Sequence, residues 1–176
     1  MMNRALELAA AGFQVFPLDE GAKTPAIMDF PRKATRDPEQ IRSWWTCPVM
    51  GWPLNRNIGI STSYFDGSSL LALDVDVKDG RRGDVTLFGL ELEHDLPATF
   101  TQQTPTGGLH LVYRVPVAIG QGADVFPGID TRSRGGYLVA RGSVVPAGEY
   151  TGDIVEPAWA PEWLVAACSR SSGPVV

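Results

Sequence analysis

The most regular pattern of hydrophobic and polar positions lies in the segment 70–77, which reads Leu-Leu-Ala-Leu-Asp-Val-Asp-Val. Its length and composition predict a β-strand, in which successive side chains point to opposite faces. One face then carries Leu71, Leu73, Val75 and Val77, and the other carries Leu70, Ala72, Asp74 and Asp76. We therefore expect one face to be core and the other to present two carboxylates.

The rest of the chain alternates between helical and strand patterns. Asp37 and Pro38 predict a helix start at which Gln40 acts as the capping-box partner. The segments 98–103 and 109–115 predict a hairpin closed by a turn at Thr104 to Gly108. Further helices are expected at 3–11, 84–94 and 162–168, and further strands at 13–16, 57–62, 129–132 and 137–140.

The length of 176 residues fits one domain with a substantial core. We expect a single domain at 1–168, built from two packed lobes at roughly 1–68 and 69–168. The composition of 169–176 predicts a disordered tail or a linker.

Composition and charge narrow the class of protein. The chain is 44% hydrophobic but lacks an apolar run near the ~18–20 residues that a membrane span needs. Glu7 stands where an export signal would be apolar, so we expect a cytoplasmic protein without membrane association. Two cysteines and two histidines are too dispersed for a zinc or disulfide framework. The net charge of −5 argues against a generic basic nucleic-acid binder.

Asp74 and Asp76 are the first candidates for chemistry. Two acids at the end of a strand are suited to hold two divalent ions, roughly 3.5–4 Å apart, for phosphoryl transfer. By itself the Asp-x-Asp pair fits equally a calcium site, a sugar-nucleotide site, a phosphatase nucleophile or two solvated acids.

Two further motifs follow in order. Gly107-Gly108-Leu109-His110 leads into a strand, and Gly128-Ile129-Asp130-Thr131-Arg132 precedes Gly135-Gly136-Tyr137. Together with the Asp-x-Asp pair and the segments 12–25, 34–45, 57–60 and 136–143, this order resembles the bifunctional DNA primase/polymerase (prim-pol) domain of the archaeo-eukaryotic primase superfamily.

The resemblance implies an α/β (α+β) fold with a catalytic sheet like that of an RNA-recognition motif. Helices would cover one face of that sheet, and an amino-terminal α/β unit would pack beside it. The polar face of segment 70–77 independently suits a sheet with one open face.

The resemblance also implies roles for particular residues. Asp74, Asp76 and Asp130 correspond to the ligands of two Mg²⁺ or Mn²⁺ ions, and His110 to a residue that contacts the phosphates of the nucleotide. Arg132 is placed to add charge beside the phosphates, and Gly107 and Gly108 to let the backbone approach them. Lesser candidates for nucleotide or template contacts are Ser143, Lys23, Arg81, Arg82 and Arg134, whereas Arg36 is expected to stay with its helix start.

The expected activity is template-directed nucleotidyl transfer, in which a primer is made and extended from (d)NTPs on single-stranded DNA, in phage or plasmid replication beside a helicase. Two alternatives remain open at this point. One is a phosphatase of the haloacid-dehalogenase type, which requires a doubly wound parallel sheet. The other is a nucleic-acid-binding module without catalysis. The catalytic interpretation requires Asp74, Asp76, His110 and Asp130 to converge on one open sheet face.

Overall fold

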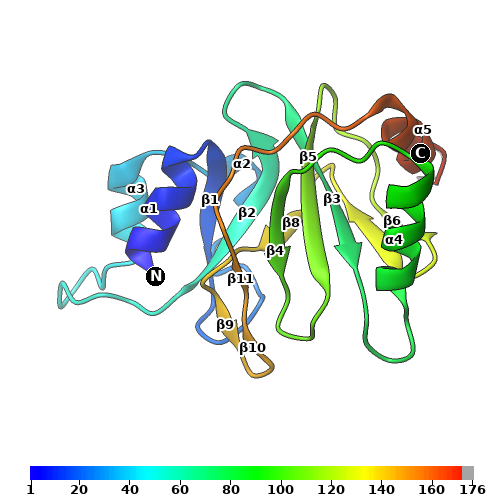
Figure 1. Cartoon of the computed structure of the whole chain (residues 1–176). Helices are drawn as coiled ribbons and strands as arrows, with labels where there is room; N and C mark the ends of the chain where they lie inside the picture. The colour runs from blue at the N-terminus through cyan, green and yellow to red at the C-terminus, as the bar shows by residue number, and fades with distance from the viewer. Residues whose placement is uncertain (172–176) are drawn as a thin grey trace.

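The computed structural model of the chain describes residues 1–171 (Figure 1). Its helices are α1 (Met2–Ala10), α2 (Phe30–Lys33), α3 (Pro38–Trp44), α4 (Gly83–Glu93) and α5 (Glu162–Ser171). Its longer strands are β1 (Phe13–Leu18), β2 (Asn57–Tyr64), β3 (Ser69–Val75), β4 (Phe100–Gln103), β5 (Leu109–Val115), β6 (Gly122–Phe126), β7 (Ile129–Arg132) and β8 (Tyr137–Val139). Three two-residue strands follow, β9 (Val144–Val145), β10 (Gly148–Glu149) and β11 (Thr151–Gly152).

The fold is a mixed α/β structure around a curled, mostly antiparallel sheet. The strands are ordered β1-β2-β3-β5-β4-β11, with β7 also paired to β3, β6 to β7 and β8 to β2. Every pair of these strands in residues 1–171 is antiparallel. The doubly wound parallel sheet that the phosphatase alternative requires is therefore contradicted.

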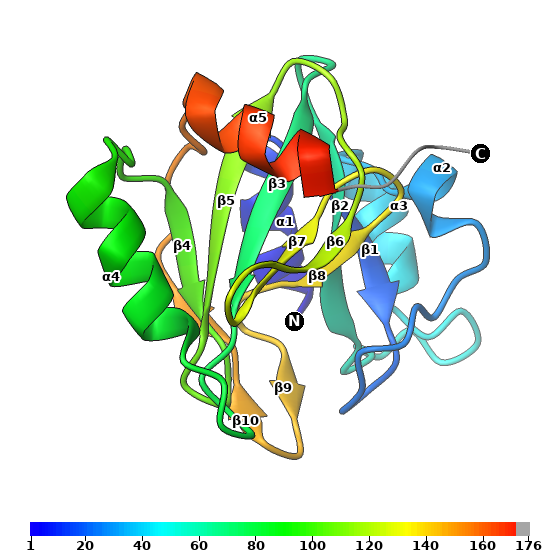
Figure 2. The same cartoon turned by 90° about the vertical axis from the view of Figure 1, so that its right-hand side faces the viewer.

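Strand β3 lies at the centre of the catalytic half of this sheet. It pairs with β5 on one side and with β7 on the other over most of its length. Its side chains alternate as the sequence predicts, so Leu71, Leu73 and Val75 pack under α4 and α5 against Leu87 and Leu164. Figure 2 shows α5 in front of the sheet and α1 behind it.

The opposite face of β3 is not open along its whole length, which corrects one expectation. Leu70 and Ala72 are fully buried and join a second core with Phe100, Val112 and residues of α1 and α3. The reason is the curl of the sheet, which brings β1 and β2 over this face. Only the end of β3 that carries Asp74 is left uncovered by this core.

Some element ends differ from the predicted ones. Strand β3 ends at Val75, so Asp76 and Val77 follow the strand. The capping box at α3 does not form, because the side chain of Asp37 accepts from the backbone N–H of Glu39 and Gln40 donates to Ser43. Helix α5 runs to Ser171, three residues past the predicted end at Cys168. The rest of the predicted tail, 172–176, lies outside the described residues, and the division into two lobes stays a prediction.

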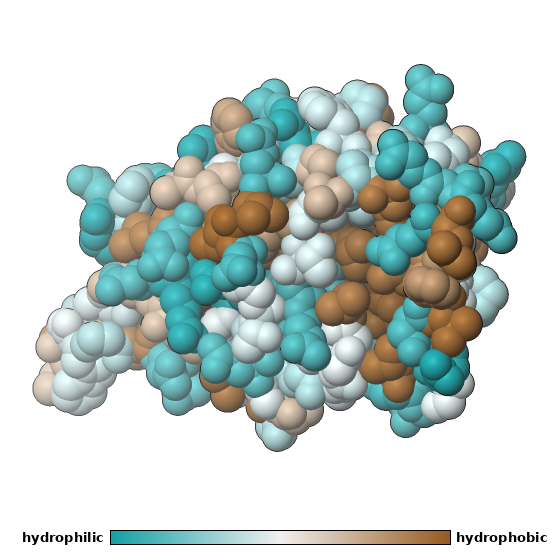
Figure 3. Space-filling view, viewed as in Figure 1, coloured by the Kyte–Doolittle hydropathy of each residue, from teal (hydrophilic) through white to brown (hydrophobic). Residues whose placement is uncertain are grey.

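The apolar periodicity of 84–94 predicts helix α4 but not which of its apolar side chains are buried. Leu87 is buried and Leu90 packs against the same core, but Val85, Phe88 and Leu92 are exposed. Figure 3 shows apolar side chains gathered on the side of the molecule where α4 lies. None of the helices in residues 1–171 combines the length and the apolar character that a bilayer span requires.

The buried state of Leu70 leads to a test of the second core. We expect Leu70→Ala to lower the free energy of unfolding by about 2–5 kcal/mol, because it leaves a cavity in a packed core. The matched control Leu92→Ala removes a side chain that is 72% exposed and should change stability by less than about 0.5 kcal/mol. Urea denaturation measures both, and equal effects would contradict the described core.

Candidate active site

Four polar side chains lie side by side across four strands. The strand register sets Gln102 of β4 opposite His110 of β5, His110 opposite Asp74 of β3, and Asp74 opposite Asp130 of β7. Residues that are directly paired across antiparallel strands point to the same face, with Cβ atoms about 4.5–5.5 Å apart. The sheet thus brings His110, Asp74 and Asp130 together, although they are far apart in the sequence.

His110 is held between two of its neighbours in this row. It is only 6% exposed, its Nε2 lies 3.3 Å from Oδ1 of Asp74, and its Nδ1 lies 2.8 Å from Nε2 of Gln102. The ring of Tyr150 lies beside it, with 5.9 Å between the ring centroids. Contacts on three sides leave the imidazole little freedom to rotate.

Asp74 is partly buried between His110 and Arg132. Burial by itself raises the pKa of Asp74, but the hydrogen bond from His110 and the charges of His110, Arg132 and Lys78 outweigh it. The net result is a pKa below the ordinary value for aspartate. Asp74 is therefore an anion at neutral pH, as a ligand for a cation must be.

Asp76 joins the site from the loop that follows β3. Its backbone N–H donates to the carbonyl of Gly128 and its carbonyl accepts from the N–H of Gly83, which fixes the loop beside β7. Its carboxylate lies 2.8 Å from Nη1 of Arg81 and 3.9 Å from Nζ of Lys78.

Arg81 connects the acids of the two motifs. Its Nη2 lies 2.9 Å from Oδ1 of Asp130 and 3.0 Å from Oδ1 of Asp124, while Nη1 binds Asp76. The hydrogen bond to Asp130 is the main cause that raises the pKa of the Arg81 guanidinium above its usual value. A second guanidinium, that of Arg132, lies 3.7 Å from both Asp74 and Asp130.

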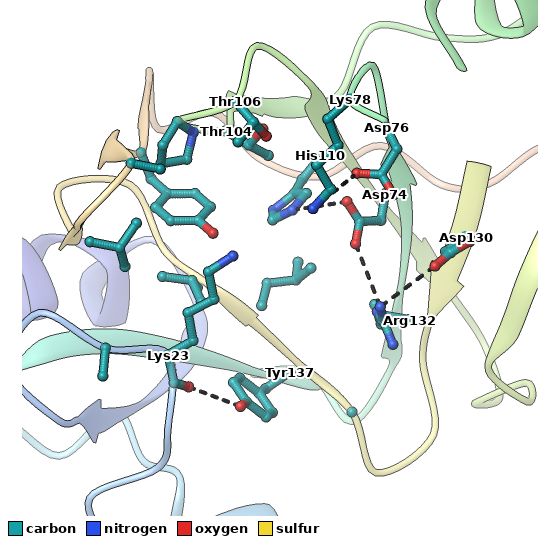
Figure 4. A pocket seen from close by; sticks show the side chains of 18 of the residues that line it. Lys23, Asp74, Asp76, Lys78, Thr104, Thr106, His110, Asp130, Arg132 and Tyr137 are labelled. Carbon is teal, nitrogen blue, oxygen red and sulfur yellow. Dashed lines mark hydrogen bonds and ion pairs between the residues drawn. The ribbon is translucent and has the colours of Figure 1, made fainter. Parts of the chain in front are cut away.

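The acids form one wall of a cavity of about 1040 Å³. Figure 4 shows Lys23 and Tyr137 across the cavity from Asp74, and Tyr150, which lies beside His110, also lines the cavity. The hydroxyl of Tyr137 donates to the carbonyl of Lys23 at 2.9 Å, and Nζ of Lys23 lies 5.8 Å from the ring centroid of Tyr150. A cavity with acids on one wall, a lysine across from them and aromatic rings in its lining can take a nucleotide-sized ligand.

Not every predicted site residue reaches this cavity. Ser143 is fully buried, and its hydroxyl accepts from the backbone N–H of Ile58, so its hydroxyl is occupied within the fold and its phosphate contact stays a prediction. Gly107 and Gly108 are absent from the described lining residues, although the turn contributes Thr104, Pro105 and Thr106.

The lesser arginine candidates also differ in whether they line the cavity. Arg82 pairs with Asp84 on the surface, and Arg134 donates to the carbonyl of Ala118. Arg36 donates to the carbonyl of Ala9 at the end of α1. Of these candidates, Arg81 alone among the described residues lines the cavity.

Sequence reasoning missed Gln102 and underrated Arg81. The register of the predicted hairpin contains a signal for Gln102, because a turn at Thr104 to Gly108 sets Gln102 opposite His110. No comparable local signal exists for Arg81, whose partners Asp76, Asp124 and Asp130 belong to different segments.

The acids fit a divalent cation by the chemistry of the donor set. Three carboxylates supply the hard oxygen ligands that Mg²⁺ and Mn²⁺ prefer. Residues 1–171 contain no group of three or more acids, histidines or cysteines arranged closely enough to hold a metal ion. Guanidinium groups lie between the carboxylates instead, so cation binding by all three acids requires Arg81 to release Asp76 and Asp130.

A comparison with protein families matches residues 5–163 to the amino-terminal domain of bifunctional DNA primase/polymerases. The match spans nearly all of the described chain, including each acid of the site and His110. A comparison with curated proteins gave no match.

The turn glycines lead to a stability test. A Cβ at Gly108 would collide with the carbonyl oxygen of Val75, so we expect Gly108→Ala to lower the free energy of unfolding by about 1–3 kcal/mol. Gly89 in α4 has open space around its Cβ position, and Gly89→Ala should stabilise the protein by about 0.5–1 kcal/mol. Urea denaturation of both variants is the measurement, and a neutral Gly108→Ala would show that the turn does not pack against β3.

Proposed function

The chain belongs to the bifunctional DNA primase/polymerase family, and on this premise we propose that it catalyses template-directed nucleotidyl transfer. The 3′-hydroxyl of a primer, or of a first nucleotide, attacks the α-phosphate of an incoming nucleotide, and pyrophosphate leaves. The observation that carries this proposal is the in-register row of His110, Asp74 and Asp130 on one wall of the cavity.

The proposed roles follow from where the side chains point. His110 and Arg132 present nitrogen donors next to the acids, where the phosphates of a nucleotide would lie. Lys23 faces them across the cavity and is suited to neutralise charge farther along the triphosphate. The aromatic rings of Tyr137 and Tyr150 offer surfaces against which a sugar or base can pack.

Asp74, Asp76 and Asp130 are the residues that would hold the divalent ions. When bound there, two such ions supply activation of the attacking hydroxyl and stabilisation of the leaving oxygens. The protein's own contribution is to hold the carboxylates ionised and to orient the nucleotide. The hydrogen bond from His110 to Asp74 helps to keep this carboxylate ionised, because it lowers the pKa of Asp74.

The strand order also supports the finer fold assignment. In the order β7-β3-β5-β4, the strands β3 and β4 flank β5 and are connected through α4, which is a split β-α-β unit. This is the arrangement expected for a catalytic sheet like that of an RNA-recognition motif.

The partners that we propose are single-stranded DNA as template and NTP or dNTP as substrate. The net charge of −5 means that affinity for these polyanions must come from local cations and bound metal. A replicative helicase as partner, and phage or plasmid replication as context, complete the proposal.

A template-directed assay tests the function. Template and nucleotides are supplied with Mg²⁺ or Mn²⁺, with and without a preformed primer, and labelled products are resolved by length. Products without a primer demonstrate priming, and products only with a primer demonstrate extension alone. Single-strand binding without incorporation under either condition would refute catalysis and favour a binding module.

The acids of the row provide the first functional prediction. We expect Asp74→Asn and Asp130→Asn to reduce nucleotide incorporation on the order of 1000-fold, because each removes an anionic ligand and about 4 kcal/mol of stabilisation. The control Asp153→Asn changes an exposed acid and should keep full activity. Circular dichroism monitors the fold. Near-normal primer extension by both site variants would refute the proposed role of Asp74 and Asp130.

Arg81 provides the second prediction. Removing its guanidinium frees Asp76 and Asp130, so we expect Arg81→Ala to bind Mn²⁺ up to about 10-fold more tightly in the absence of nucleotide. Arg82→Ala is the matched control, because Arg82, the next residue of the same loop, forms an ion pair with Asp84 and not with an acid of the site. Calorimetric titration with MnCl₂ measures the affinities, and weaker binding by Arg81→Ala would show that Arg81 does not compete with the cation.

A further inference from the structure

Gln102 is the one member of the polar row without a role so far. It lies on β4 opposite His110, is only 1% exposed, and uses both ends of its amide in hydrogen bonds. The orientation of this amide is defined by its bonds to backbone groups, because turning it over would break them.

The backbone around β8 fixes which end of the amide faces His110. The Oε1 atom of Gln102 accepts from the backbone N–H of Arg141 at 2.9 Å, and Nε2 donates to the carbonyl of Val139 at 2.6 Å. In the reversed orientation, an NH₂ group would face the Arg141 N–H and an oxygen would face the Val139 carbonyl. Both contacts would be repulsive, so the amide nitrogen must lie on the side of His110.

This orientation determines the tautomer of His110. The Nε2 of Gln102 lies 2.8 Å from Nδ1 of His110 and has only hydrogens to offer, so Nδ1 must be the acceptor. In the neutral imidazole the hydrogen then resides on Nε2, which faces Asp74 and the cavity. His110 therefore presents an N–H donor toward the place where the acids meet the ligand.

We propose that Gln102 is a positioning residue that holds His110 in the Nε2–H tautomer, so that the N–H, which faces Asp74 in the free protein, can donate to an anionic oxygen of the nucleotide when the nucleotide binds. The inference rests on the proposed function for the identity of the ligand, a nucleoside triphosphate. It does not rest on it for the tautomer, which follows from the hydrogen bonds of Gln102 alone. Gln102 also ties β4 to β8 and thereby links the acidic wall to the segment that leads to Tyr150.

The tautomer can be measured directly in the free protein. The chain contains only two histidines, His94 and His110, so a long-range ¹H–¹⁵N correlation spectrum of histidine-labelled protein contains two ring systems. His94→Gln assigns the signals, and the spectrum is recorded at about pH 8, where a free imidazole is neutral. We expect Nε2–H for His110 in the wild type, and Nδ1–H would overturn the proposal without any variant at the site.

Two substitutions at Gln102 separate positioning from packing. Gln102→Glu puts an acceptor next to Nδ1 and should shift His110 to the Nδ1–H form, whereas Gln102→Leu removes the partner and should leave a mixture of tautomers. Both should weaken the binding of dATP with Mg²⁺, measured by calorimetry without template, by about 10-fold or more. Gln103→Leu, at the exposed neighbouring position of β4, should change neither readout.

The outcomes distinguish this inference from the proposed function. A Gln102→Leu protein with lower stability but an unchanged tautomer and unchanged dATP affinity would mean that Gln102 is only structural, and would overturn the inference. A wild-type protein with the Nε2–H tautomer and dATP binding but no incorporation would refute the proposed function and leave the inference intact. Nucleotide incorporation by a wild-type protein in the Nδ1–H form would overturn the inference and leave the proposed function intact.

Discussion

The site depends on one constraint, the register in which β3 pairs with β5 and β7. This register brings Asp74 level with His110 on one side and with Asp130 on the other. A slip of one residue would move Asp74 to the face covered by α4 and α5, where Leu71, Leu73 and Val75 are packed. The buried leucines and valines therefore hold the polar row in place, because they make every other register costly.

Charge balance is the second requirement of the structure. Asp74, Asp76 and Asp130 lie close together in partly buried positions, and unpaired carboxylates there would be destabilising. Arg81 and Arg132 compensate them in the structure described here. Under the proposed function, a divalent ion would be an alternative partner to these arginines for the same carboxylate oxygens.

The curl of the sheet supplies the second wall of the cavity that the polar row lines. Strands β1, β2 and β8 fold over the face of β3 that carries Ala72, and β8 brings Tyr137 to the wall opposite the acids. Gln102 connects these two parts, because its amide contacts His110 on one side and the backbone of residues 139–141 on the other. The cavity, the row and the second core are thus consequences of the same folding of the sheet on itself.

The local sequence pattern determined several strands, a hairpin and the family of this protein. Alternating residues indicated β3 and β5, and the glycine-rich turn indicated the hairpin of β4 and β5. The order of Asp74, Asp76, His110 and Asp130 indicated the family that the match over 5–163 shows. Such features are local, because strand alternation and turn chemistry depend on adjacent residues. Tertiary structure decided the burial of Leu70 and Ala72, the burial of Ser143, the bridging position of Arg81 and the orientation of Gln102. Each of these depends on which distant segments meet across the curled sheet, and that is a long-range packing outcome that no local pattern encodes.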